Sequence, residues 1–182
     1  MQPFLFIILF IAAFLERTVF DLGPNIELVT ATALLASVYL GGKWSIPLLL
    51  LVLILSDIII GNSNIFLFTW SGLLIPIFLA GYIFKRNNTN KVALGTGLGI
   101  LTTLFFFVWT NFGVWALDSW GMYSNDLSGL TQSYINALPF LRLHMASTLM
   151  FVPVGFILIE TLIAISKSHL LLPLRNLRIL RT

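Results

Sequence analysis

Six apolar runs occupy most of this chain, and they constrain its fold more strongly than any other feature of the sequence. They cover residues 3–20, 28–40, 44–60, 65–84, 92–109 and 143–165. Five of them reach the roughly 17 to 25 residues that a membrane-spanning helix needs. Because charged residues make up only 9% of the chain, against about 25% in soluble domains, we expect an all-α integral membrane protein with a six-transmembrane-helix bundle over residues 1–166.

The run at 28–40 is shorter than the others, and two interpretations of it stand. It is either re-entrant or a crossing helix that its neighbours shelter from lipid. The first run, at 3–20, has no Lys or Arg before it and no convincing A-x-A site, so we expect it to remain as a helix rather than be cleaved as a signal peptide.

Basic residues assign the two ends of the bundle, because Lys and Arg are retained on the cytoplasmic side of a membrane. If all six runs cross and both termini are cytoplasmic, only Arg17 and Arg142 of the ten basic residues lie outside. The others are Lys43, Lys85, Arg86, Lys91, Lys167, Arg175, Arg178 and Arg181. Without a crossing at 28–40, the basic loop at 85–91 would lie outside. We therefore expect six passes through the cell membrane.

Acidic residues concentrate at the opposite end. In this topology only Glu160 lies on the inner side. The other six of the seven acids are Glu16, Asp21, Glu27, Asp57, Asp118 and Asp126. Acids contribute little to orientation, so this clustering is not a consequence of the topology rule. It indicates that the chemistry of the protein lies on its outer face.

Residues 110–139 are expected to form a long, structured outer loop. The segment combines rings, amides and acids: Asn111, Trp115, Asp118, Trp120, Tyr123, Asn125, Asp126, Gln132, Tyr134 and Asn136. Long loops without regular structure are usually binding loops or disordered, and disordered segments are poor in aromatic residues. Two interpretations stay open, a ligand pocket with flat aromatic faces and an interfacial aromatic belt with capping residues.

The first outer segment supplies a second group of polar residues, namely Glu16, Arg17, Asp21, Asn25, Glu27 and Thr30. Gly23-Pro24-Asn25 is a turn signal. Charges at this depth usually face a bundle interior or a wet cavity, which favours a pocket. The alternative to a pocket is a structural salt bridge between Arg17 and Asp21, which stand four residues apart if the helix continues that far.

Asp57 and His144 lie near the outer ends of the third and last runs. A bare carboxylate facing lipid is expensive, so Asp57 is expected to face inward, either in a pocket or bonded to neighbouring hydroxyl and backbone groups. A single His is more often a structural hydrogen-bond donor than a ligand. No Cys is present and no imidazole cluster is evident, so we expect neither a metal site nor a cofactor.

Gly95 and Gly99 lie in an apolar run without the Lys-Ser/Thr of a phosphate loop, so they predict close helix packing. No nucleotide-hydrolysing motif occurs, so energised uptake would need another polypeptide. A scattered net charge of +3 does not suggest nucleic acid. Residues 167–182 form a basic amphipathic cytoplasmic tail with arginines spaced by three, suited to an anionic leaflet or to a cytoplasmic partner.

The blocks GPNIELVTATALLASVYLGGKW, LSDIIIGN, FFFVWTNFGVW and GLTQSYINALPF resemble an uncharacterised bacterial and archaeal membrane family related to S components, the substrate-capture subunits of energy-coupling factor transporters. The resemblance implies a six-helix bundle with a ligand site near the outer surface, roofed by the first, third and fifth loops. Mapped here with the outer acids and rings, that site comprises Glu16, Arg17, Asn25, Glu27, Asp57, Asn111, Trp115, Asp118, Trp120, Tyr123 and Tyr134. The Ala-x-x-x-Ala motif through which many S components meet their partner is absent from the first run.

The function that follows is a substrate-binding membrane subunit, not an enzyme, for uptake of a small heterocyclic vitamin-like or precursor molecule. Its partners would be a coupling subunit and two ATPases. The excess of outer acids favours a neutral or cationic ligand. Two alternatives stay open, an intramembrane enzyme on lipid-linked substrates that uses Asp118 and Asp126 or His144, and a structural subunit of a membrane complex.

Overall fold

The computed structural model of this chain describes residues 2–20, 22–61, 63–86, 90–118 and 121–179, with side chains as far as Lys167. Within these ranges the regular structure is helical and contains no strand, as expected. The elements are α1 (Gln2–Leu15), η1 (Glu16–Phe20), α2 (Val29–Tyr39), α3 (Gly42–Ile60), α4 (Phe66–Arg86), α5 (Lys91–Leu117) and α6 (Leu127–Ile179). Five helical stretches are long and apolar enough to cross a membrane, and α2 is a shorter apolar helix.

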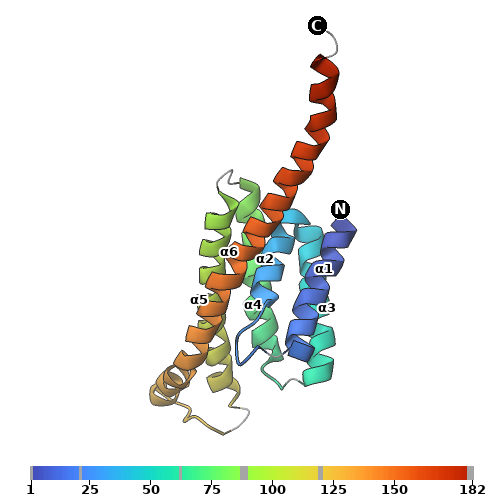
Figure 1. The fold of residues 1–182 in the computed structure, drawn as a ribbon. Helices are drawn as coiled ribbons and strands as arrows, with labels where there is room; N and C mark the ends of the chain where they lie inside the picture. The colour runs from blue at the N-terminus through green and yellow to red at the C-terminus, as the bar shows by residue number, and fades with distance from the viewer. Residues whose placement is uncertain (1, 21, 62, 87–89, 119–120, 180–182) are drawn as a thin grey trace.

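The six helices alternate in direction (Figure 1). One end of the bundle holds the start of α1, the turn from α2 to α3, and the junction of α4 with α5. We call it the basic end, because the basic residues in these stretches are Lys43, Lys85, Arg86 and Lys91. The opposite end, which holds η1 and the connection from α5 to α6, is called the acidic end. Placement of the basic end in the cytoplasm stays a prediction from charge.

Helix α2 forms the centre of the bundle. Its 11 residues rise about 16 Å, roughly half the hydrocarbon thickness. It packs against α1, α3, α4, α5 and α6, and every residue from Val29 to Ser37 is buried. The short run is therefore sheltered by its neighbours. Residues 22–28 lead into α2 from the acidic end (Figure 1), and they are exposed or partly buried.

Helices α5 and α6 pack closely at Gly95 and Gly99, where the glycine spacing predicts close packing. A Cβ at Gly95 would overlap the ring of Phe156, and one at Gly99 would lie 2.9 Å from Thr148 Cγ2. The absence of these side chains lets α6 approach, and a buried contact of 2.8 Å between the hydroxyls of Thr103 and Thr148 joins the two helices.

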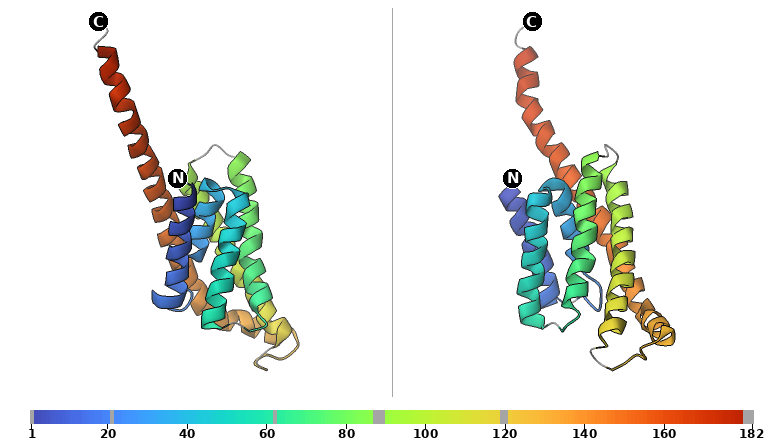
Figure 2. Two further views of the ribbon diagram at one scale, coloured as in Figure 1. Left: turned by 90° about the vertical axis from the view of Figure 1, so that its right-hand side faces the viewer. Right: turned by 180° about the vertical axis from the view of Figure 1, so that it is seen from behind.

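The expectation of a long loop at 110–139 is wrong. Helix α5 continues to Leu117 and α6 begins at Leu127, so only residues 118–126 connect them. The lower hydropathy of residues 110–139 therefore belongs to the end of α5 and the start of α6. In this part of α6 the small residues Gly129, Ser133 and Ala137 are buried. The first turns of α6 lie across the bundle axis before the helix runs along it (Figure 2). Pro139 lies in this stretch and removes one hydrogen bond from the helix.

Helix α6 also continues past the expected boundary at 166–167 and projects beyond the basic end (Figure 1). Arg175, Arg178 and Arg181 fall outside the described side chains. The basic amphipathic face of the tail therefore stays a prediction.

Candidate ligand-binding site at the acidic end

Five ionisable residues from four parts of the chain meet inside the acidic end. Glu16 and Arg17 come from η1, Glu27 from the segment before α2, Asp57 from α3 and His144 from α6. We call them the buried charge cluster. Its first two members lie in a π-helical turn, a widened form of helix that is often found at functional sites.

Arg17 ties the cluster together. Its Nη2 donates to Asp57 Oδ1 at 2.9 Å and its Nε donates to Ser56 Oγ at 2.8 Å. Its Nη1 lies 3.6 Å from Glu27 Oε2. The indole N–H of Trp70 donates to Asp57 Oδ2 at 2.7 Å, so both oxygens of that carboxylate have a donor. Asp57 faces inward, as expected.

The segment at residues 22–28 is held against the bundle by side chains of its neighbours. The Leu28 N–H donates to Glu16 Oε2 at 2.9 Å, and Glu16 is only 4% exposed. Ser147 of α6 bonds both backbone groups of Glu27, accepting from its N–H at 3.0 Å and donating to its carbonyl at 2.9 Å. Gly23 and Asn25 have positive φ in the turn that the sequence predicts, closed by a bond from Ile26 N–H to Gly23 O.

Glu27 and His144 form the least satisfied contact in the cluster. His144 Nε2 lies 3.3 Å from Glu27 Oε1 and 3.2 Å from the Thr30 hydroxyl. The Glu27 contact lacks the alignment of a hydrogen bond, and Oε1 is buried with no hydrogen-bond partner. The cluster thus holds three carboxyl groups and one guanidinium, which contacts Asp57 and Glu27, and a second positive charge is present only when His144 is protonated. The cluster has an excess of negative charge.

A small pocket of about 40 Å³ adjoins the cluster. Its lining residues are Asn25, Phe106, Phe107, Thr110, Asn111, Phe140, Leu141 and His144. The volume is close to the roughly 30 Å³ that one water molecule occupies in the liquid. The pocket brings the predicted residues Asn25 and Asn111 together, but in this conformation it is far below the roughly 300 to 1,000 Å³ of a small-molecule site.

The aromatic residues of the predicted site lie elsewhere, in the α5–α6 connection and the helix ends beside it. Trp115 Nε1 donates to Ser124 O at 3.1 Å, the Tyr134 hydroxyl donates to Val108 O at 3.1 Å, and Asn136 Nδ2 lies 3.5 Å from the Tyr123 hydroxyl. These contacts are those of local packing and capping. A binding role for Trp115, Tyr123 and Tyr134 stays a prediction, and Trp120 lies outside the described residues.

The two acids of the same connection also have local partners. Asp118 Oδ1 accepts from the Met122 N–H at 3.1 Å. Asp126 Oδ1 accepts from the Gly129 N–H at 2.8 Å and from the Ser124 hydroxyl at 2.7 Å, which caps α6. These bonds, the Gly129 bond first, hold the pKa of Asp126 below its ordinary value. Neither carboxylate is placed with His144 as a catalytic pair by any of these bonds.

Ser56, Trp70 and Ser147 belong to the site although sequence reasoning did not select them, and His144 was interpreted as a structural donor. Helical spacing could have found part of this set, because His144 and Ser147 stand three apart on one face of α6. The alternative pairing of Arg17 with Asp21 falls on a residue outside the described ranges. Among the described residues, no group of three His, Cys, Asp or Glu is arranged to hold a metal ion.

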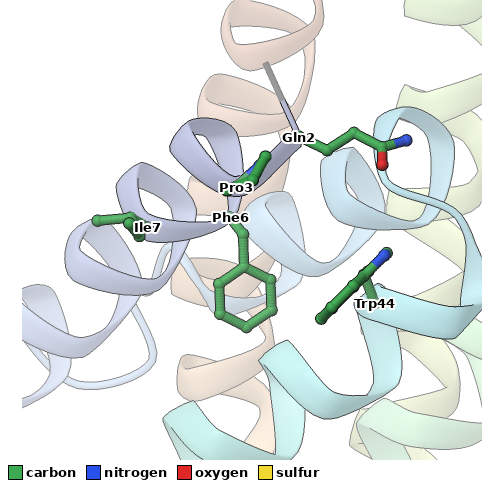
Figure 3. A pocket seen from close by; sticks show the side chains of 5 residues that line it. All are labelled: Gln2, Pro3, Phe6, Ile7 and Trp44. Carbon is green, nitrogen blue, oxygen red and sulfur yellow. The ribbon is translucent and has the colours of Figure 1, made fainter.

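The basic end shows a different arrangement. Glu160 Oε1 accepts from the Tyr39 hydroxyl at 2.6 Å and from Lys91 Nζ at 2.9 Å, and Lys91 also lies over the Tyr39 ring. An apolar pocket of about 180 Å³ lies between α1 and α3 at the same end of the bundle (Figure 3). There the ring of Phe6 meets that of Trp44 edge-on, with centroids 6.0 Å apart. Two donors therefore meet at one oxygen of the Glu160 carboxylate, and the pocket between α1 and α3 is apolar.

Comparison with known proteins gives one match. Residues 1–170 match a family described as a family of unknown function (DUF6580). No curated protein and no solved structure matches the chain.

Proposed function

The chain belongs to DUF6580, a family of unknown function, and we propose from its own side chains that it is a substrate-binding membrane subunit. It captures a small cationic or neutral heterocyclic molecule at the acidic end. In this proposal it resembles an S component: the acidic end faces outward, and a separate coupling subunit with two ATPases supplies the energy for uptake across the cell membrane.

The observation that carries the proposal is the excess of buried negative charge. Ionisable residues inside a membrane bundle are costly and usually mark a substrate or ion pathway. A cluster kept only to join helices would be expected to balance its charges, because an uncompensated buried charge destabilises the fold by several kcal/mol. Here the side chain of Glu27 is only 16% exposed, and one of its oxygens has no hydrogen-bond partner.

A cationic group on a ligand would supply the missing positive charge. The field of the cluster favours such a group and disfavours a polyanion. Asn25 and Asn111, which share the small pocket with His144, offer amide donors and acceptors for the polar edge of a ring. Phe106 and Phe107 offer aromatic faces in the same pocket.

Binding of a ring needs a wider pocket than the one present, so the site must open. The segment at residues 22–28 is the element whose movement would do this, because it has no regular structure. It is attached through the Leu28–Glu16 and Glu27–Ser147 bonds. Opening would expose Glu27 and the pocket together, and closure over a ligand would bury the new charge pair.

The test is ligand identification on the purified protein. Small molecules that copurify are identified by mass spectrometry, and a panel of cationic, neutral and anionic heterocycles is screened by thermal unfolding. We expect a cationic or neutral compound to stabilise the protein and Glu27→Gln to weaken its binding at least tenfold. Glu160→Gln is the matched control, because it removes a carboxylate from the opposite end and should leave affinity unchanged.

Two outcomes would contradict the proposal. One is that no molecule copurifies and no compound in the panel changes the unfolding temperature. The other is that Glu27→Gln and Glu160→Gln alter binding equally, which would remove the cluster from the site.

A further inference from the structure

A larger apolar groove runs along the outside of the bundle at the basic end. Its volume is about 400 Å³, and it lies between α1 and α6, which both pack on α2 but, over the described residues, not on each other. Leu5 and Ile8 line it from α1, Ile159 and Ile163 line it from α6, and Tyr39 lines it from α2. The groove thus lies between two helices that leave a gap, with Tyr39 at the end of α2 as part of its wall.

The lining residues change from apolar to polar along each helix. Ile159, Ile163 and Lys167 stand four residues apart on α6 and so share one face, with Ser166 beside the last of them. On α1, Gln2 lines the same groove one turn before Leu5. The groove therefore has aliphatic walls that end in a rim of an amide, a hydroxyl and an ammonium group.

The ammonium group at the rim is available for an anion. Glu160 is the nearby carboxylate, and it already accepts from both Lys91 and Tyr39. Lys167 is exposed, and no ion pair joins it to a described carboxylate, although it interacts with Glu160 electrostatically at longer range. Among the side chains that the structure describes here, two lysines, Lys91 and Lys167, face one glutamate, which leaves one unbalanced positive charge.

We propose that this groove binds an anionic phospholipid, with an acyl chain between α1 and α6 and the headgroup phosphate at Lys167. Gln2 and Ser166 can donate further hydrogen bonds to the same phosphate. Basic pockets between helices on one side of a membrane recognise anionic headgroups in this way. The inference is independent of ligand capture at the acidic end.

The length of the groove favours an acyl chain over a transmembrane helix as its occupant. From Ile159 to Lys167 the helix rises about 12 Å, which matches most of one leaflet of a hydrocarbon core roughly 30 Å thick. A membrane-spanning helix from another protein would need a contact surface that extends through both leaflets. Toward the membrane centre the lining of the groove ends at Ile8 and Ile159, so the groove provides a contact surface in one leaflet only.

The test is native mass spectrometry of the purified protein with phosphatidylglycerol and phosphatidylcholine of matched chains. The wild-type protein is expected to retain one phosphatidylglycerol in preference to phosphatidylcholine. One lysine near the surface contributes about 1 kcal/mol to binding of anionic lipid, so Lys167→Gln should weaken retention about fivefold. Lys167→Arg should keep it. Arg86→Gln is the matched control, because Arg86 stacks on Tyr82 at the same end and does not line the groove.

A second pair of variants tests the groove itself. Ile163→Trp should fill it and abolish retention of the lipid, and Leu5→Trp fills it from the opposite wall if the first variant does not fold. Equal loss in Lys167→Gln and Arg86→Gln, or equal retention of the two lipids, would overturn the inference. A photo-crosslinker at position 163 should label lipid in membranes; a crosslink to another polypeptide instead would assign the groove to a protein partner and overturn it as well.

Discussion

Replacement of Arg17 by Gln should destabilise the protein far more than replacement of Glu27 by Gln. Arg17 is the guanidinium of the buried charge cluster and contacts two of its carboxylates, Asp57 and Glu27, and its side chain is 18% exposed. At an effective dielectric constant of about 20, each of its contacts with Asp57 and Glu27 amounts to roughly 5 kcal/mol before the cost of desolvation. Removing one partner of such a buried pair costs about 3–5 kcal/mol net, because the remaining charges stay buried.

Glu27→Gln has the opposite effect on the charge balance. It removes one carboxylate of three and keeps the shape of the side chain, so stability should stay unchanged or rise by about 0.5–2 kcal/mol, with loss of function as the compensating cost. In the double variant the two changes should not add, with an interaction energy of about 1–3 kcal/mol, because the residues share one network.

The assay is unfolding of the four proteins in one detergent, followed by circular dichroism against temperature and against denaturant. For a chain of this length, 1 kcal/mol corresponds to about 2–4 °C in the unfolding temperature, so Arg17→Gln should lower it by roughly 10 °C. Equal destabilisation by Arg17→Gln and Glu27→Gln would show that the carboxylates are balanced elsewhere, and the inferred charge excess would then be wrong.

Three further predictions concern packing, capping and sidedness. Gly95→Ala should destabilise by about 1–3 kcal/mol, because its Cβ overlaps a phenyl ring of α6, whereas Gly97→Ala meets nothing within 4 Å and should stabilise the helix; equal unfolding temperatures would contradict this. The lowered pKa of Asp126 means that its capping contribution is complete above about pH 4, the unfolded pKa, and is lost as the pH falls through the folded pKa; the NMR shift of the Gly129 amide should follow this titration and be flat in Asp126→Asn. Because the chain has no cysteine, Asp126→Cys should react with an impermeant maleimide in intact cells and Lys85→Cys only after permeabilisation, and the reverse pattern would invert the topology.

Local features of the sequence predicted the fold well for segments whose residue types alone indicate whether they are buried. The run at 28–40 was too short to span but uniformly apolar or small, which is what a central helix surrounded by others requires. Gly95 and Gly99 predicted close helix packing for a steric reason that needs no tertiary information, but the identity of the partner helix, α6, comes from the structure. The prediction of a loop at 110–139 was wrong because polar side chains there form hydrogen bonds within helices, as Asn111 does with the carbonyl of Phe107. Low hydropathy was therefore not a sign of a loop.

The site was predictable in its members but not in its pairings. Arg17, Glu27 and Asp57 were each expected to face inward from the cost of exposing charge to lipid. Nothing local indicated that Arg17 would bond Asp57, 40 residues away, or that Glu27 would be attached to Ser147, 120 residues away. Such pairings depend on how the helices are arranged. The sequence also gives no distance between the aromatic rings of the α5–α6 connection and the buried charge cluster. The prediction therefore placed both groups in one site.

The two ends of the bundle treat a carboxylate in different ways, and the difference bears on function. At the basic end Glu160 is partly exposed, its side chain being 39% accessible, yet two donors converge on one of its oxygens. At the acidic end Glu27 is more deeply buried, where an unmet hydrogen bond costs more, yet Oε1 has none. In the proposed function, this oxygen receives the cationic group of the ligand, so the charge-balance experiment on Arg17 and Glu27 tests that proposal and the fold together.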